Sequence, residues 1–462
     1  MQKSVFLSLA LALLFAAGAS AAMNGQILNC DAPNPTQPQN CVDNWALDLL
    51  DESKTAIETA PGALPRDRKH YFDGDGTGVH IFILDTGVDG TNPDFKTLGN
   101  PAGSRLGLQY PGYLNIDGGS SSHGTRVAGL AAGLQYGVAK GATIHPIYTA
   151  GSINPTGGDA LLARLDWVLS QVRDYAMKPA VLNMSFNILS PVKNSAGQNM
   201  EPQLTAKVLE LISNGVVVTV SAGNQNGNPA ALWPSKIQEV ILVGGVDEYG
   251  NRWVRDTSDP EWQALCVAQG DCGSNYGTLV DIWAPAKYIR SAVKSGQRDE
   301  NGRRISSGTS YAAPLVAGLA ALHLQQNPTA TPAAVRSALL GNAANLGDID
   351  GSGYADYMAR SPVATPACNV TQRLFVNTGL SVRYFSSQLR DSCPAGYDAT
   401  SQFNAAHGQI GITGIGPNDI SYSYIPSSGY TGTDQFNYDI YTNFGGSYGT
   451  GTVAVTVQPN HN

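Results

Sequence analysis

The chain has 462 residues and a formal net charge of -8 at pH 7. This length suggests two or three domains of about 150 residues each. A hydrophobic content of 42% with only 14% charged residues excludes a highly charged disordered chain. The acidic balance also argues against nucleic-acid binding, because nothing in the composition attracts a phosphate backbone.

Residues 1–21 are predicted to be a secretory signal peptide. Lys3 supplies positive charge, residues 5–17 form an apolar segment, and the small residues 19–21 form a cleavage site. The apolar segment is shorter than the ~20 residues that a membrane span needs, and no later run reaches that length. We therefore expect a secreted protein without a membrane span.

The six cysteines contain no Cys-x-x-Cys spacing, which argues against a zinc or thioredoxin-like site. Export favours disulfide bonds, although several connectivities are open. The connectivity with the shortest sequence separations joins neighbouring cysteines along the chain: Cys30 with Cys41, Cys266 with Cys272, and Cys368 with Cys393.

Residues 22–42 are rich in Asn, Pro and Gln and are predicted to be an irregular leader. From 43 to 345, continuous β-branched apolar runs alternate with amphipathic stretches. Such runs are typical of strands buried on both faces of a parallel sheet. The pattern predicts an α/β fold with a doubly wound, mostly parallel sheet. The expected strands are 79–85, 143–148, 180–186, 216–223, 240–246 and 279–285, and the expected helices are 124–133, 158–174, 201–214, 310–325 and 332–341.

The composition changes after residue 345. Residues 346–367 are predicted to be a linker, and residues 368–462 show short alternating segments separated by Gly, Ser, Asn and Thr. This pattern predicts a small all-β sandwich. Residues 427–457 resemble the end of bacterial cadherin-like or Ig-like modules, which implies a module that binds a surface or another protein.

Four polar residues are expected on one edge of the predicted sheet. Asp85 and Asn224 follow apolar strands, whereas His123 and Ser310 begin helices. In a parallel α/β sheet, sites lie beyond the carboxyl ends of the strands. A nucleophilic serine needs a base, a group that orients the base, and donors for the oxyanion. These residues provide such a set, although each alone is also an ordinary cap or turn residue.

The segments that carry these residues read "FILDTGVD", "SSHGTRVAG", "VTVSAGNQNGNP" and "SSGTSYAAPLVAG". They resemble the four signature blocks of subtilisin-like serine proteases (subtilases, peptidase S8 family), on the proteinase K side of that family. The resemblance covers residues 43–345 and implies a secreted endopeptidase that acts on proteins and peptides. It assigns the general base to His123, its orientation to Asp85, the nucleophile to Ser310, and the oxyanion hole to Asn224 with the Ser310 N–H.

One wall of the implied specificity pocket departs from the family, which typically has Ser-Leu-Gly-Gly where this chain has "SFN". A side chain in place of glycine should narrow the pocket, so we expect a preference for small or medium residues before the cleaved bond. The resemblance assigns substrate binding to both walls, namely Ser185, Phe186 and Asn187 on one side and Ser221, Ala222 and Gly223 on the other.

The resemblance also implies structural Ca²⁺. Asp281 aligns with a calcium-binding aspartate of proteinase K, and the carbonyls of Gln238 and Val240 align with its partners. The alternative is an aspartate that forms an ion pair or a cap. Separately, residues 348–356 begin with the Asp-x-Asp-x-Ser-Gly pattern of an EF-type loop, although position twelve is Ala359 and not glutamate.

The sequence leaves two other functions open. Residues 85–87 spell the Asp-Thr-Gly motif of aspartic proteases, but that chemistry needs two such aspartates in an all-β fold, and 256–258 is an imperfect copy. The other alternative is a catalytically inactive subtilase that acts as an extracellular binding or adhesion protein. A fluorophosphonate probe separates these alternatives, because it labels an activated Ser310.

Overall fold

The structure is a computed structural model, and the residues that it describes exclude the predicted signal peptide and the linker residues 362–370. Cys272 is disulfide-bonded, but its predicted partner and the other cysteines lie outside the described residues. No helix in the described part is long and apolar enough to cross a membrane. The described residues are 24–27, 45–51, 69–72, 74–97, 100, 102–112, 117–118, 122–149, 153–254, 272–294, 305–361, 371–377, 382–385, 397–400, 405–416, 419–428, 430–442 and 447–458.

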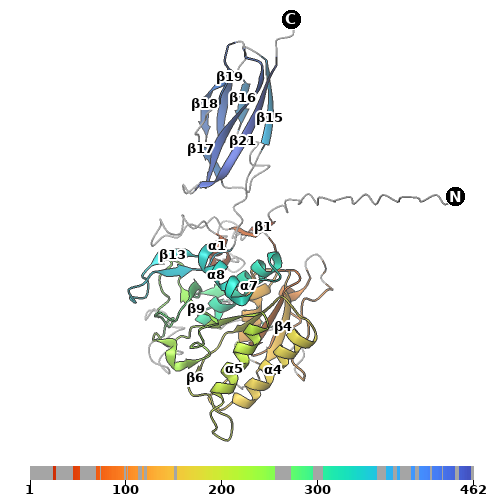
Figure 1. The fold of residues 1–462 in the computed structure, drawn as a ribbon, viewed down its shortest axis with the longest axis vertical. Helices are drawn as coiled ribbons and strands as arrows, with labels where there is room; N and C mark the ends of the chain where they lie inside the picture. Colours follow the sequence, from red (N-terminus) through yellow and green to blue (C-terminus); the bar gives the residue numbers. More distant parts are fainter. Residues whose placement is uncertain are drawn as a thin grey trace, which may run out of the picture.

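An eight-stranded sheet with the order β13-β14-β10-β9-β7-β5-β3-β4 forms the centre of the α/β part. Its neighbouring strands are parallel, except that β13 is antiparallel to β14. All six predicted strands are present, which confirms the mostly parallel sheet (Figure 1). The strands are β3 (His80–Asp85), β4 (Thr143–Tyr148), β5 (Ala180–Met184), β7 (Val216–Ser221), β9 (Ile241–Val246), β10 (Ile282–Pro285), β13 (Ala344–Gly347) and β14 (Asp356–Met358).

Helices cover both faces of this sheet. Successive side chains of a strand point to opposite faces, so Ile81 and Ile83 join one buried apolar cluster while Phe82 and Leu84 join the other. The first cluster includes α1 (Trp45–Asp51), α3 (His123–Ala132), α7 (Thr309–Gln326) and α8 (Pro332–Asn342); the second includes α4 (Gly158–Asp174) and α5 (Glu201–Ser213). This two-sided burial explains why the strands are continuously apolar in the sequence.

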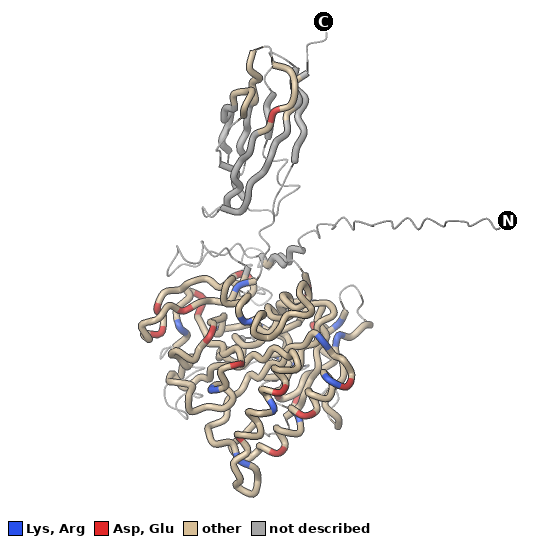
Figure 2. Tube along the Cα trace, viewed as in Figure 1, with Lys and Arg blue, Asp and Glu red and all other residues tan. Residues whose placement is uncertain are grey.

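Short elements complete the α/β part. Three two-stranded sheets join β1 (Asn24–Ile27) to β2 (Lys69–Phe72), β6 (Ile188–Leu189) to β8 (Leu232–Trp233), and β11 (Ile289–Arg290) to β12 (Ile305–Ser306). The 3₁₀ helices are η1 (Pro93–Phe95) and η2 (Pro229–Ala231). Charged residues of both signs are scattered along the described chain, as Figure 2 shows.

Two predicted boundaries need correction. The leader is not irregular throughout, because β1 pairs antiparallel with β2. The linker does not begin at 346, because β14 pairs with β10 inside the main sheet. Ser361 N donates to Leu50 O at 2.6 Å, which ties residue 361 to the first helix. The α/β part therefore extends at least to Ser361.

The C-terminal segment forms two sheets, a four-stranded sheet with the order β15-β21-β20-β17 and a three-stranded sheet with the order β16-β19-β18. Tyr424 Oη of β19 donates to Asp434 Oδ2 of β20 at 2.7 Å, and this bond joins the two sheets. Strands therefore occur where the alternating segments predicted them. They are β15 (Thr371–Asn377), β16 (Val382–Phe385), β17 (Tyr397–Thr400), β18 (Gly408–Gly416), β19 (Asp419–Pro426), β20 (Gly432–Thr442) and β21 (Ser447–Gln458).

Candidate active site

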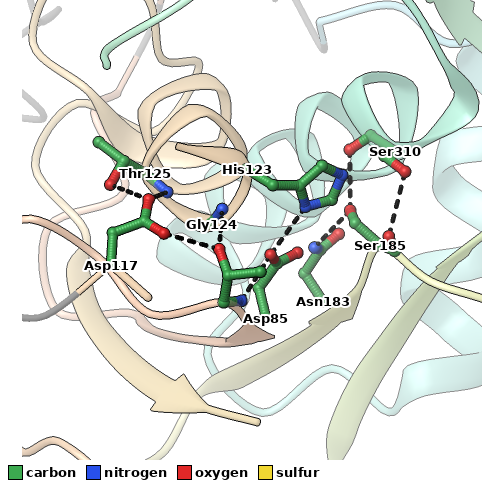
Figure 3. A network of polar contacts seen from close by, with 9 residues as sticks. Asp85, Asp117, His123, Gly124, Thr125, Asn183, Ser185 and Ser310 are labelled. Atoms are coloured by element: carbon green, nitrogen blue, oxygen red, sulfur yellow. Dashed lines mark hydrogen bonds and ion pairs between the residues drawn. The ribbon is translucent and has the colours of Figure 1, made fainter. Parts of the chain in front are cut away.

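The four predicted polar residues lie at the carboxyl ends of the central strands. Asp85 is the last residue of β3, and Asn224 follows β7. His123 is the first residue of α3, and Ser310 is the second residue of α7. Figure 3 shows the imidazole of His123 between Asp85 and Ser310. The structure thus brings together the residues that the sequence selected.

A short hydrogen bond joins His123 to Asp85. His123 Nδ1 donates to Asp85 Oδ1 at 2.7 Å, and Thr86 N donates to the same oxygen at 2.7 Å. Asp85 is 1% exposed, so its charge acts in a poorly solvated environment. Burial favours neutral His123, but the charge and hydrogen bond of Asp85 outweigh this effect and raise the pKa of His123. The bond at Nδ1 leaves Nε2 to face Ser310.

The close approach of α3 to the end of β3 makes this pair possible. A Cβ added at Gly124 would lie 2.1 Å from Gly87 O, so only glycine allows this separation. The residue after His123 therefore sets how closely the helix start approaches Asp85.

Ser310 lies at the start of α7, where backbone N–H groups have no partner within the helix. Pro314, four residues later, has no N–H for Ser310 O. The hydroxyl of Ser185 replaces this bond, because Ser185 Oγ donates to Ser310 O at 2.8 Å. Ser310 Oγ donates to Ser185 O at 3.1 Å. Among the described residues, no hydrogen bond joins Ser310 to His123.

The amide of Asn224 is held in one orientation. Its Oδ1 accepts from Thr309 N at 2.9 Å and from Thr309 Oγ1 at 2.8 Å. Its Nδ2 lies beside Gly308, where an added Cβ would approach it to 3.3 Å. Gly308 has a φ of 143°, a conformation that favours glycine. Asn224 Nδ2, the hydrogen-bond donor of this amide, therefore lies next to the backbone of Gly308, two residues before Ser310.

The segment 185–187 differs from the sequence prediction in one respect. Phe186 is 8% exposed and packs in the apolar cluster on the α4 and α5 side. The side chain of Asn187 instead crosses to the opposite segment, where Nδ2 donates to Ser221 O at 2.9 Å. Ser235 Oγ donates to Asn187 Oδ1. The Asn187 side chain therefore bridges the two segments that the sequence assigns to the pocket.

The opposite segment, 221–223, is tied to the start of α7. Gly223 N donates to Thr309 Oγ1 at 3.0 Å, and Gly223 has a φ of 97°. Ser221 is 1% exposed, and Ala222 is fully buried. Both segments thus flank Ser310 and are joined to it or to its neighbour by hydrogen bonds.

Sequence reasoning missed a further buried carboxylate, Asp117. It lies beside the Asp85–His123 pair and accepts hydrogen bonds from Thr86 and Thr125 (Figure 3). Asp117 and Gly118 are described without their immediate neighbours, and neither belongs to a named helix or strand. Its position six residues before His123 was the only signal in the sequence, and that signal carries no chemistry of its own.

Asp281, the residue predicted to bind calcium, makes two polar contacts in the structure. Its Oδ1 forms an ion pair with Arg336, and its Oδ2 accepts from Leu242 N at 2.8 Å. Gln238 and Val240 precede β9, the strand that begins beside Asp281. The contact with Arg336 agrees with the alternative of an aspartate that forms an ion pair.

A cluster of three carboxylates is found in the EF-type loop. Ligand oxygens of Asp348, Asp350 and Asp356 lie within 4.8 Å of one another. Gly277 N donates to Asp350 Oδ2 at 2.8 Å, and Trp283 Nε1 donates to Asp356 Oδ1 at 2.7 Å. These bonds fix the loop against the end of the main sheet. An all-oxygen set of this kind suits a hard cation.

Residues 76–359 match the Peptidase_S8 family, described as the subtilase family. The chain belongs to the subtilase family. This match confirms the family that the four sequence blocks predicted. The mostly parallel sheet also differs from the all-β fold that the aspartic protease alternative requires, and residues 256–258 lie outside the described residues.

This subtilase is similar to the extracellular serine proteinase of Thermus sp. (strain Rt41A), with 34% identity over 300 residues that make up 64% of this chain and 60% of the relative. It is 29% identical to alkaline serine exoprotease A of Vibrio alginolyticus over 304 residues, or 65% of this chain and 46% of the relative. The chain thus spans less than two thirds of either relative. The solved structure of a cold adapted subtilisin-like serine proteinase shows 28% identity and a TM-score of 0.49, covering 69% of this chain and 97% of that chain.

Proposed function

We propose that this subtilase is a secreted serine endopeptidase of the proteinase K-like branch that hydrolyses peptide bonds in proteins. The observation that carries the proposal is the 2.7 Å bond between Asp85 and His123, with the imidazole facing Ser310 at a helix start. The predicted signal peptide and the printed name of the extracellular relative from Thermus support secretion.

The proposed reaction begins when Ser310 Oγ attacks the carbonyl carbon of the scissile bond and transfers its proton to His123 Nε2. Asp85 stabilises the imidazolium through Nδ1 and does not itself take up the proton. His123 then gives the proton to the leaving amine, which produces an acyl-enzyme. Water attacks this ester with His123 again as the base, and Ser310 is regenerated.

The oxyanion of each tetrahedral intermediate would be bound by Asn224 Nδ2 and by the Ser310 N–H. The Asn224 amide is suited to this role because Thr309 occupies its oxygen. The present bond from Ser310 Oγ to Ser185 O must be exchanged for one to His123 before attack. This is consistent with free enzymes, in which catalytic hydrogen bonds often form only in the substrate complex.

Substrate specificity is proposed to arise between segments 185–187 and 221–223, with Ser185, Phe186, Asn187, Ser221, Ala222 and Gly223 forming or supporting the two sides. The Asn187 side chain bridges these segments and takes up space that glycine leaves open in the family. We therefore propose a preference for Ala, Val or Leu over Phe and Tyr before the cleaved bond.

Structural Ca²⁺ is proposed for the loop 348–356 and not for Asp281. Asp348, Asp350 and Asp356 would hold the ion, which would neutralise three mutually repelling carboxylates and stabilise the loop. Ala359 supplies no ligand at position twelve, so the set lacks the bidentate glutamate of a full EF-hand.

The domain arrangement proposed for the whole chain is a signal peptide (1–21), a leader (22–42), a catalytic domain that begins at 43 and extends at least to 361, a shortened linker, and a C-terminal β-sandwich (368–462). The bond between Tyr424 and Asp434 across two sheets supports a cadherin-like or Ig-like sandwich. We propose that this module binds a surface or another protein.

A fluorophosphonate probe tests the proposed function on the full chain. Labelling is expected at Ser310, with loss of labelling in Ser310→Ala and strong reduction in His123→Ala. Cleavage of a protein substrate within the chain should accompany labelling. An unlabelled, inactive protein with a native melting temperature would favour the alternative of an inactive extracellular binding protein.

A further inference from the structure

The buried carboxylate Asp117 contacts residues next to both members of the Asp85–His123 pair. Its Oδ1 accepts from Thr86 Oγ1 at 2.8 Å. Its Oδ2 accepts from Thr125 Oγ1 at 2.6 Å and from Thr125 N at 3.1 Å. Thr86 follows Asp85 directly, and Thr125 is two residues after His123 (Figure 3). One carboxylate thus connects the end of β3 to the first turn of α3.

The acceptor character of a carboxylate determines the direction of these hydrogen bonds. An ionised carboxylate only accepts, so the Thr86 and Thr125 hydroxyls must each donate their proton to Asp117. The oxygen of Thr86 is then free to accept from Gly124 N, as observed at 2.8 Å. The oxygen of Thr125 likewise accepts from Asp89 N at 3.0 Å. A neutral amide at position 117 presents one donor end and breaks this pattern.

The contacts reach the catalytic pair itself. Thr86 N donates to Asp85 Oδ1, the same oxygen that binds His123 Nδ1. Gly124, whose N–H binds the Thr86 hydroxyl, follows His123 in the chain. We therefore expect a change at Asp117 to displace both Asp85 and His123, because Asp85 and Gly124 are each two hydrogen bonds from Asp117 through Thr86.

The charge of Asp117 also acts on the imidazole. It adds to that of Asp85 in raising the pKa of His123, whereas burial and the Arg126 charge act in the opposite direction. Tyr311 of α7 packs against the imidazole, with ring centroids 5.7 Å apart. Lys294 Nζ lies 3.5 Å from the backbone oxygen of Asp117. These groups, with Asp85, are titratable or charged residues that lie around His123 and Asp117 in the described part of the chain.

We propose that Asp117 is a positioning residue of the catalytic site: it fixes the geometry of the Asp85–His123 pair through Thr86 and Thr125, and its charge favours the imidazolium that forms during catalysis. This inference rests on the proposed peptidase function. It adds a second buried carboxylate to the proposed mechanism, one that touches neither the substrate nor the imidazole.

Asp117→Asn tests both effects in the full-length protein. Because a small misplacement of catalytic groups is costly, kcat should fall on the order of 10²-fold while KM changes little. Loss of the negative charge should move the acidic limb of the pH profile of kcat/KM to lower pH. Thr125→Val removes both hydrogen bonds of the Thr125 hydroxyl, to Asp117 and from Asp89 N, but keeps the Asp117 charge, so kcat should fall while the acidic limb stays in place. Asp174→Asn is the matched control, because Asp174 forms an exposed ion pair with Arg173. It should change neither kcat nor the acidic limb.

The outcomes separate this inference from the proposed function. If wild type is not labelled by the fluorophosphonate probe, the proposed function itself fails. If wild type is labelled and Asp117→Asn keeps its kcat and acidic limb, the inference is overturned, even when the melting temperature falls. If Asp117→Asn does not fold, the kcat of Thr125→Val is the test. An unchanged kcat in Thr125→Val would overturn the inference that Asp117 positions the pair through Thr125.

Discussion

Replacing Asn187 by glycine should widen the substrate preference of the protein. The substitution removes the Cβ and the amide group that cross from segment 185–187 to Ser221 and Ser235. Each methylene in an apolar pocket is worth about 1–3 kcal/mol, or roughly 10–200-fold in kcat/KM. We expect Asn187→Gly to raise kcat/KM for Phe before the cleaved bond, relative to Ala, by on the order of 10²-fold.

The substitution also has a predictable cost in stability. Ser221 and Ser235 are 1% and 2% exposed, so removal of Asn187 leaves buried polar groups without this partner. Such a loss typically costs about 1–3 kcal/mol in the free energy of unfolding. The melting temperature should therefore fall together with the change in preference.

Peptide-library profiling of wild type, Asn187→Gly and Phe186→Leu is the assay. Phe186 packs in the core, so Phe186→Leu should lower stability without changing the preference. The reasoning is refuted if wild type already favours Phe or Tyr, or if Phe186→Leu alone admits them. An unchanged profile in Asn187→Gly would show that the bridging side chain does not limit the pocket.

Three further predictions follow from the site and the acidic loop. Ser310→Ala and His123→Ala should each abolish peptidase activity at an unchanged fold, and the double variant should be scarcely worse than either, as kinetic assays and circular dichroism would show. Catalysis requires neutral His123, and the Asp85 charge outweighs burial and raises the pKa of His123 above its ordinary value of 6.5. The acidic limb of the pH profile of kcat/KM should therefore lie above pH 6.5. A limb below pH 6.5 would contradict the assignment of His123 as the base. A chelator should lower the melting temperature of wild type and of Asp281→Asn but not of Asp350→Asn; the reverse ranking would return calcium to Asp281.

The sheet and its helices were largely predictable because burial on both faces leaves a strong sequence signal. Continuous β-branched runs gave every strand from β3 to β10 in the main sheet, within a few residues at each end. β13 and β14 were missed because they flank the Gly- and Asp-rich segment 348–356, which has the composition of a loop. Their strand conformation depends on tertiary pairing, of β14 with β10 and of β13 with β14, which local sequence does not contain.

The burial of Phe186 follows from the alternation of side chains along the sequence. Leu182 and Met184 of β5 face the cluster on the α4 and α5 side, and Phe186 continues this alternation two residues on. Asn187 has the opposite parity and so points toward the other side. Asp117 was not predictable in the same way, because a carboxylate in a loop shows its role only when the fold brings Thr86 and Thr125 around it.

The segment that carries Asn187 also supports the nucleophile, so specificity and turnover should be coupled here. Ser185 O accepts from Ser310 Oγ, and Ser185 Oγ replaces the helix hydrogen bond that Pro314 cannot make. Two residues away, Asn187 anchors the same segment to Ser221. Releasing that anchor should loosen Ser185 and, through it, the start of α7. A substitution that only enlarged the pocket would leave kcat for an Ala substrate unchanged, whereas this arrangement requires Asn187→Gly to lower it.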